Sequence, residues 1–193
     1  ANQHEPGPQT VLGKTYAQGG QDQGVAVLKD LARHPATANH IAHKLARHFV
    51  ADMPPPSLVE KLSQSFTRSN GDLKAVYETL IDAPESWSPQ PAKIRSPQEH
   101  LIAMIRASDT RMKPAMVVTT LKAMGQPLWE PPGPNGFADT ADVWASPEGL
   151  STRLEVANSL SVRAAERLDA RELGEGLFGA ALSDPTRTEF MRR

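Results

Sequence analysis

Two stretches of this sequence carry most of the side chains that could do chemistry. The first is a helix-like segment over residues 35–50, one face of which carries imidazole, ammonium and guanidinium groups within about two turns: His40, His43, Lys44 and Arg47. Because these groups follow a helix N-terminus, which itself attracts negative charge, they favour an anion or an acidic partner. The simpler alternative, a solvated polar face, is the commoner arrangement on an amphipathic helix.

A metal site is a poorer interpretation of the same face. His40 and His43 lie three residues apart and could chelate an ion, but no carboxylate between Asp30 and Asp52 completes the ligand set. His34 precedes Pro35 and is expected to be buried and hydrogen-bonded at a corner between two helices, with a functional role as the alternative. The sequence predicts neither a metal nor a cofactor.

The second stretch is a Pro- and Gly-rich loop over residues 125–144. Four prolines stiffen it, so that large side chains can be held at a small entropic cost. Carboxylates beside aromatic rings recur where sugars or cationic ligands bind, and paired carboxylates also act as acid and base. The alternative is a rigid loop whose aromatic side chains fold back onto the helices. The aromatic residues are Trp129, Phe137 and Trp144, and the carboxylates are Glu130, Asp139 and Asp142.

Composition excludes several classes of protein. The 193 residues, 39% hydrophobic and 22% charged, suit a globular chain. The net charge of −1, from 21 basic and 22 acidic residues, argues against nucleic-acid binding. The absence of cysteine removes disulfides, thiolate zinc sites and cysteine nucleophiles. No apolar run approaches the ~20 residues that a membrane span requires.

Helical periodicity dominates the chain after its first residues. We expect an all-α fold, an irregular bundle of roughly seven to nine mostly short helices. Residues 1–24 are expected to form an extended arm with a short strand around Thr10–Leu12. Residues 25–193 then form one helical domain, with the Pro/Gly-rich loop 125–145 inserted, or part of a larger domain.

Two helices have a clear expected buried face. In the helix over 35–50, Ile41, Leu45 and Phe49 are spaced by four residues, with alanines beside them at 38, 42 and 46. In the helix that begins at Ser146-Pro147-Glu148, the expected apolar seam consists of Leu150, Leu154, Ala157 and Leu160.

Local signals place several helix ends. Ser57 with Glu60, and Ser96 with Glu99, have the spacing of a capping box, and Asp72 is expected to cap a further helix. Residues 115–124 include a β-branched run, yet Gly125 suits the position after a helix end, so we expect a helix there.

Several of these motifs together resemble a bacterial domain-of-unknown-function family, number 1800. They include His34-Pro35-Ala36-Thr37-Ala38, Pro84-Glu85-Ser86-Trp87 and Ser96-Pro97-Gln98-Glu99; the strongest runs from Gly125-Gln126-Pro127 through Pro134-Asn135-Gly136 to Trp144. The chain resembles the C-terminal part of this family, which is longer and whose N-terminal half has no counterpart here.

The resemblance implies a largely helical protein with no assigned activity. Members are often expected to be exported, which points to a periplasmic location. Their genes commonly lie beside those of another uncharacterised family, number 1501, which is similar to sulfatase-like proteins. A protein of that neighbouring family, or the N-terminal half of the family, is therefore the expected partner.

These observations lead to two hypotheses about function, and to a third possibility, an incomplete half-domain whose exposed apolar face marks the missing N-terminal partner and which would self-associate in solution. The first is an exported helical interaction or scaffold module that binds a protein partner or an anionic ligand through the 125–144 loop and the His/Arg face. The second is part of a polysaccharide-acting enzyme, or a carbohydrate-binding protein, that uses the same loop with Glu130, Asp139 or Asp142 as acid and base.

Overall fold

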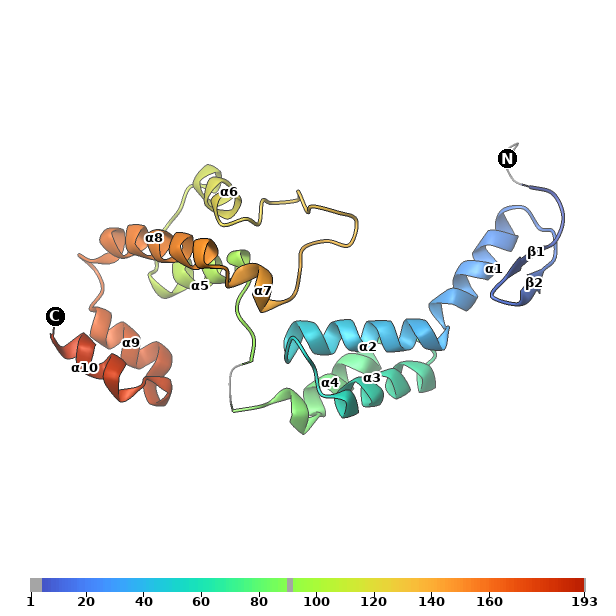
Figure 1. The fold of residues 1–193 in the computed structure, drawn as a ribbon, viewed down its shortest axis with the longest axis horizontal. Coiled ribbons are helices and arrows are strands. Elements are labelled where there is room, and N and C mark those ends of the chain that lie inside the picture. The colour runs from blue at the N-terminus through green and yellow to red at the C-terminus, as the bar shows by residue number, and fades with distance from the viewer. Residues whose placement is uncertain (1–4, 90–91, 193) are drawn as a thin grey trace. The chain divides into compact units, whose positions relative to one another are not determined.

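The computed structural model describes residues 5–89 and 92–192, with side chains up to residue 189 (Figure 1). Within these residues it has ten α-helices, two short 3-10 helices and one two-stranded sheet, which confirms the all-α prediction. The chain divides into two compact units, Ala1–Lys93 and Ile94–Arg193. This division falls inside the single domain expected over residues 25–193.

The chain begins with a β-hairpin rather than a plain extended arm. Strands β1 (Gln9–Val11) and β2 (Lys14–Tyr16) pair antiparallel. Leu12 and Gly13 form the turn between them, both with positive φ, at 48° and 77°. Such turns match the twist of the paired strands. The expected strand is therefore present one residue earlier, and its partner strand was not predicted.

The hairpin is tied to helix α1 (Gln21–Ala32) by polar contacts with Asp30 and Gln23. Lys14 Nζ and Tyr16 Oη donate to Asp30 Oδ2 at 2.5 and 2.8 Å, and Gln23 Nε2 donates to the Tyr16 carbonyl at 3.0 Å. Helix α1 thus begins inside the segment that we expected to be extended, and the hairpin packs on it as a small capping element.

Low pH is expected to loosen this hairpin. The hydrogen bond from Lys14, and then that from Tyr16, hold the pKa of Asp30 below its ordinary value of 3.8. A lowered folded-state pKa stabilises the fold fully above the ordinary value, and the contribution is lost as pH falls through the folded value. The protection of the hairpin amides against hydrogen exchange, measured relative to their intrinsic chemical rate, should therefore fall as the pH is lowered from about 5 to about 2. Asp30→Asn should remove that dependence, and equal behaviour of both proteins would contradict this contact.

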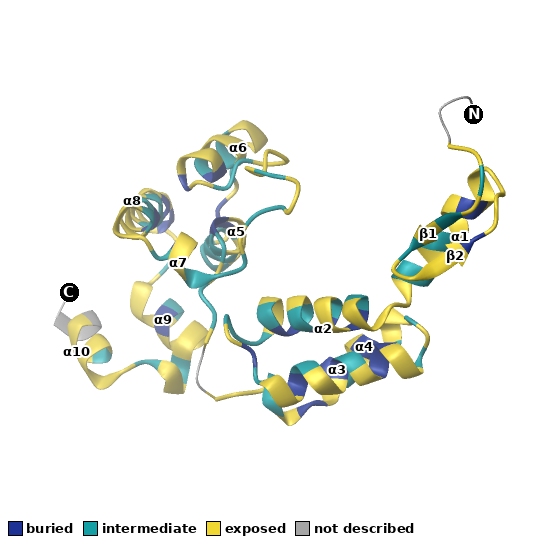
Figure 2. Ribbon diagram, turned by 45° about the vertical axis from the view of Figure 1, so that its right-hand side comes forward, coloured by how far each residue is buried: buried dark blue, intermediate teal, exposed yellow. Residues whose placement is uncertain are grey.

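Helices α2 (Pro35–Phe49), α3 (Pro56–Arg68) and α4 (Leu73–Asp82) pack together in the first unit, with their buried faces turned toward each other (Figure 2). The fully buried positions of α2 are Ala38, Ala42 and Ala46. The expected buried face is wrong at Phe49, which is 62% exposed, while Ile41 and Leu45 only flank the core. Small alanine side chains let α3 approach α2 closely, so the core is filled from α3 and α4.

The start of α3 differs from the expected capping box. The helix begins at Pro56, with Pro55 before it, so Ser57 already lies within the first turn. Its hydroxyl donates to Glu85 Oε1 at 3.2 Å, in the short helix η1 (Pro84–Ser86), instead of capping α3. Proline suits the first helical position because it has no N–H to satisfy, and this preference overrides the Ser57–Glu60 pattern. The Asp72 cap of α4 is confirmed, since Lys74 N donates to Asp72 Oδ1 at 3.0 Å.

The second unit is built on helix α5 (Pro97–Ala107), helix α6 (Pro114–Ala123) and helix α8 (Pro147–Ala164). Its buried core consists of Leu101, Leu121, Met124 and Leu160. Short helices α7 (Ala141–Trp144), α9 (Ala170–Phe178), η2 (Gly179–Ala181) and α10 (Asp184–Arg192) complete it. The capping box at the start of α5 is confirmed, because Ser96 N donates to Glu99 Oε2 and Glu99 N to Ser96 Oγ.

Helix α6 is confirmed despite its β-branched run, and Gly125 lies just beyond its C-cap residue, Met124, as expected. Gly125 has φ of 82°, and its N–H donates to the Lys122 carbonyl at 3.1 Å. Gln126 N then donates to the Leu121 carbonyl at 2.9 Å. This pair of bonds is the Schellman arrangement, which satisfies the last helical carbonyls and fixes the direction in which the following loop leaves.

The buried face of α8 is rotated from the expected seam. Leu154 is 72% exposed and Leu150 is also exposed, whereas Arg153, Leu160 and Ala164 are buried. These buried positions also follow helical spacing, so both faces are consistent with the periodicity. Leu160, which both faces share, packs with Leu101 and Leu121, and Val156 packs against the same core, so the inward face is the one that also carries Arg153.

Candidate binding site

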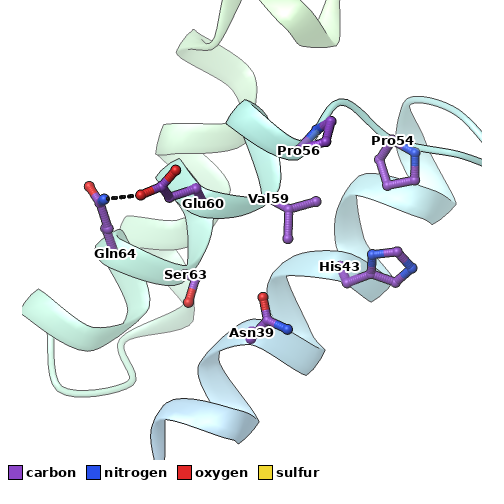
Figure 3. A pocket seen from close by; sticks show the side chains of 8 residues that line it. All are labelled: Asn39, His43, Pro54, Pro56, Val59, Glu60, Ser63 and Gln64. Atoms are coloured by element: carbon purple, nitrogen blue, oxygen red, sulfur yellow. Dashed lines mark hydrogen bonds between the residues drawn. The ribbon is translucent and has the colours of Figure 1, made fainter.

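The cationic residues expected to converge on α2 have separate surroundings. His40 and Lys44 are exposed, whereas His43 is half-buried and lines a groove between α2 and α3 (Figure 3). Arg47 Nε donates to the Asp52 carbonyl at 3.2 Å, so its guanidinium helps to hold the chain that follows the helix. The groove therefore receives only His43 from the face that we expected to bind an anion.

The groove has a mixed polar lining and a cavity volume of about 530 Å³. Glu60 lies in its wall and accepts a hydrogen bond from Gln64 Nε2 at 3.1 Å (Figure 3). The remaining lining residues are Asn39, Pro54, Pro56, Val59 and Ser63. A carboxylate beside neutral amide and hydroxyl groups suits an uncharged polar ligand better than an anion. The anion interpretation of this face stays a prediction.

His34 lies at the corner between α1 and α2. Its Nδ1 accepts a hydrogen bond from Ala36 N at 3.1 Å, which makes the imidazole the N-cap of α2. Thr37 Oγ1 donates to the Leu31 carbonyl at 2.7 Å across the same corner. His34 is exposed rather than buried as expected.

Within the described residues, no group of three or more His, Asp or Glu side chains is placed to hold a metal ion.

Two of the three aromatic residues of the 125–144 loop fold back onto the protein. Trp144 is only 6% exposed, and its indole Nε1 donates to the Ala138 carbonyl at 2.9 Å. The ring of Phe137 lies 6.4 Å from that of Trp144, tilted by 51°. For these two residues the loop is an extension of the core, and they anchor its C-terminal end.

Trp129 has the opposite environment. It is 89% exposed, and its backbone φ is 62°. The residue lies in a turn closed by a hydrogen bond from Glu130 N to the Pro127 carbonyl, 3.4 Å long. Positive φ is rare outside glycine and asparagine and costs on the order of 1–2 kcal/mol for other residues. A large apolar side chain kept in water on a strained backbone is the strongest functional signal in the loop.

Relief of this strain is expected to stabilise the second unit. Trp129→Gly puts at this turn the residue that adopts positive φ without steric cost, and it removes no buried contact. We expect the free energy of unfolding to rise by about 1 kcal/mol. Urea denaturation, followed by the NMR signals of α5 and α8, measures this change. A clear loss of stability would mean that the exposed indole packs on the fold.

The carboxylates of the loop do not form a closed site. Glu130 and Asp142 are exposed, and Asp139 is half-buried. The three hollows described on the surface are lined by other residues. Acid–base catalysis requires titratable groups that converge on one reacting position. Glu130 and Asp142, which are both exposed, are not enclosed with a second titratable group in any of these hollows.

Two polar side chains in the second unit have buried nitrogen atoms that were not expected from the sequence. Arg153 in α8 is 7% exposed, and His100 in α5 is half-buried. Arg153 Nη2 and His100 Nε2 are both inaccessible to solvent and have no hydrogen-bond partner in the described structure. The available signal was the spacing of Arg153, Val156 and Leu160, which places an arginine on an apolar stripe.

The comparisons with known proteins give a family and no activity. A family model described as "Protein of unknown function (DUF1800)" matches residues 1–193. The chain belongs to this family. The family resemblance noted in the motifs is thereby confirmed, and it extends over the whole chain. Searches of curated proteins and of solved structures gave no match. In this DUF1800 chain, no helix within the described ranges is long and apolar enough to cross a bilayer.

Proposed function

We propose that this chain is a helical binding module that docks a partner protein through the 125–144 loop, with Trp129 as the anchor. The observation that carries the proposal is the indole of Trp129, 89% exposed on a backbone with positive φ. Such an arrangement disfavours the free protein, because it leaves apolar surface in water and strains the turn. A partner that covers the indole removes this apolar surface from water, so the hydrophobic effect favours the complex.

The rest of the loop supports the same role. Its first residues are held to α5, because Gln98 N donates to Gln126 Oε1 at 2.8 Å. Its last residues are held by the buried Trp144. Prolines at positions 127, 131, 132 and 134 restrict the backbone between these ends. A pre-organised loop loses little conformational entropy on binding, and tryptophan is among the residues that most often dominate binding energy.

The partner that we propose is a protein of the neighbouring family, number 1501, exported together with this chain. This choice rests on the family resemblance, and the location in the periplasm is part of the same proposal. The His/Arg face of α2 belongs to the proposal as a second contact, since His40 and Lys44 are exposed there.

Light scattering tests the proposal. The purified chain is measured alone, then with the neighbouring-family protein, and then with an N-terminally extended form of the chain. We expect a stoichiometric complex with the neighbouring-family protein that does not form with Trp129→Gly. Two independent species in every mixture would contradict docking.

A carbohydrate ligand is the second candidate, and one observation favours it. Glu130 directly follows Trp129, and both side chains are exposed, so a carboxylate lies beside an open aromatic face. Sugars stack on such faces while a carboxylate accepts from their hydroxyls. Retardation of the protein by a soluble polysaccharide in a native gel, lost in Trp129→Gly, together with no protein complex, would favour this function over the first.

A further inference from the structure

We propose that the hollow between α5 and α9 binds a small amphiphilic anion, a molecule with an apolar body and one carboxylate group. The hollow lies within the second unit and has a volume of about 790 Å³. It shares no lining residue with the 125–144 loop, so the proposal does not depend on the proposed docking function.

The size and lining of the hollow are those of a small-ligand site. Small-molecule sites are concave, measure about 300–1,000 Å³, and are lined mainly by apolar side chains with a few polar groups that fix the orientation of the ligand. This hollow has such a volume, and most of its lining is apolar. Protein partners instead bury about 800 Å² of extended surface on each side. One small molecule is therefore the occupant that we infer.

Apolar side chains from both helices are open to water in the hollow. Ile102 is 46% exposed, Leu177 52% and Phe178 55%. Ala103 and Ala107 lie four residues apart on one face of α5, where their small side chains leave space opposite the larger ones. A ligand that covers these side chains removes apolar surface from water, so the hydrophobic effect favours its binding.

Positive charge predominates in the same lining. Arg95 and Arg106 are exposed, and none of the hydrogen bonds or ion pairs among the described residues involves either guanidinium group. The carboxylate in the lining, Glu99, is engaged in the cap of α5. Its Oε2 accepts from Ser96 N at 2.8 Å and from Ser96 Oγ at 2.9 Å. Two guanidinium groups without a counter-charge therefore outweigh one carboxylate that is already hydrogen-bonded.

These charges favour an anion as the polar part of the ligand. A guanidinium group presents N–H donors in one plane, which match the two oxygen atoms of a carboxylate. Arg106 follows Arg95 by 11 positions, or roughly 16 Å along a helix, so one carboxylate reaches one of them while the apolar body lies along α5. His100, also in the lining, is neutral at pH 7, because burial, followed by the positive charges of Arg153 and Arg95, lowers its pKa.

Calorimetric titration of the full chain tests the proposal with three ligands that share one alkyl chain and differ in head group: sodium decanoate, decyl maltoside and decyltrimethylammonium bromide. Each is used below its micelle concentration and at constant ionic strength. We expect decanoate to bind about tenfold more tightly than the cationic ligand, since it gains a charge-assisted contact with a guanidinium group. Absence of decanoate binding, or equal affinity for the three ligands, would overturn the proposal.

Variants of the lining locate the bound ligand. The double variant Arg95→Gln, Arg106→Gln should weaken decanoate binding about tenfold and leave that of decyl maltoside within about twofold. Both arginines are exposed, so their replacement leaves the core intact. Arg163→Gln is the matched control, because Arg163 is an exposed arginine on α8 that lines a different hollow. Unchanged decanoate affinity in the double variant, or equal weakening in the control, would contradict this site.

Two further measurements separate a free ligand from other occupants. Co-sedimentation with phosphatidylglycerol vesicles tests a membrane surface, and binding of vesicles without binding of decanoate would overturn the proposal. Light scattering of the ligand-free chain tests a second copy. Self-association that Phe178→Ala abolishes would show that another copy covers the hollow, and it would also overturn the proposal. We expect a ligand-free monomer whose decanoate binding is weakened by Phe178→Ala, since that change removes part of the apolar wall.

Discussion

Phe66→Ala is expected to lower the free energy of unfolding of the first unit by about 3–5 kcal/mol. Phe66 is 5% exposed and belongs to the core cluster with Leu62 and Val76. Its ring also covers Gly71, since a side chain at that position would lie 3.5 Å from Phe66 Cζ. Truncation would remove buried apolar surface and leave a cavity between α3 and α4. Urea denaturation, followed by the NMR signals of α2 to α4, measures the loss.

Phe49→Ala is the matched control, because it makes the same chemical change on an exposed residue. Phe49 is 62% exposed at the end of α2 and contacts the His48 ring edge-to-face, with centroids 4.7 Å apart. We expect a loss below about 1 kcal/mol. The sequence periodicity alone predicts a large loss at Phe49, so similar losses in the two variants would contradict the observed rotation of α2.

Trp129→Ala is expected to weaken binding of the neighbouring-family protein by about 30-fold or more, since truncation of an anchoring tryptophan usually costs at least about 2 kcal/mol. The indole has the largest exposed apolar surface of the loop, while Trp144 is buried and already hydrogen-bonded. Biolayer interferometry with the immobilised chain measures the change. Unfolding is no alternative explanation, because the exposed side chain makes no core contact.

Trp87→Ala serves as the control for Trp129→Ala. Trp87 is also exposed, at 69%, and follows η1 in the first unit, where its Nε1 donates to the Ile81 carbonyl at 2.6 Å. We expect its replacement to leave the affinity within about twofold of the wild type. Equal weakening in both variants would show a general dependence on exposed indoles and would remove the special role of Trp129.

Local features of the fold were predictable from the sequence. The Ser96–Glu99 capping box, the Asp72 cap and the helix end at Gly125 depend only on residues within a few positions of each other. The Ser57–Glu60 box failed for a local reason as well. Pro56 fixed the start of α3 and left Ser57 inside the first turn.

The rotation of helices was not predictable, because it depends on distant residues. On α8, Leu154 and Arg153 belong to two stripes with helical spacing that share Leu160, and the sequence does not show which of the two turns toward Leu101 and Leu121. The spacing of Arg153 with Val156 and Leu160 was a signal for this stripe, but it did not show that the stripe is the buried one. On α2, the alanines are buried in place of Phe49 because α3 approaches that side.

The sequence placed the candidate site in the 125–144 loop, but it did not show which residue of the loop is available for binding. The sequence left open whether the loop aromatics bind a partner or extend the core. The structure divides them: Trp144 folds inward because its indole reaches the Ala138 carbonyl, while Trp129 is held outward in its turn. Both outcomes depend on backbone conformation within the loop, which composition does not specify.

The indole N–H region of an ¹⁵N-correlated NMR spectrum tests the docking claim most directly. The three tryptophans give three signals, and Trp129→Gly and Trp87→Ala assign them. On addition of the neighbouring-family protein, we predict that the Trp129 signal shifts until a stoichiometric end point is reached, while the Trp87 signal stays in place. A Trp129 signal that does not change at saturating partner would contradict the account.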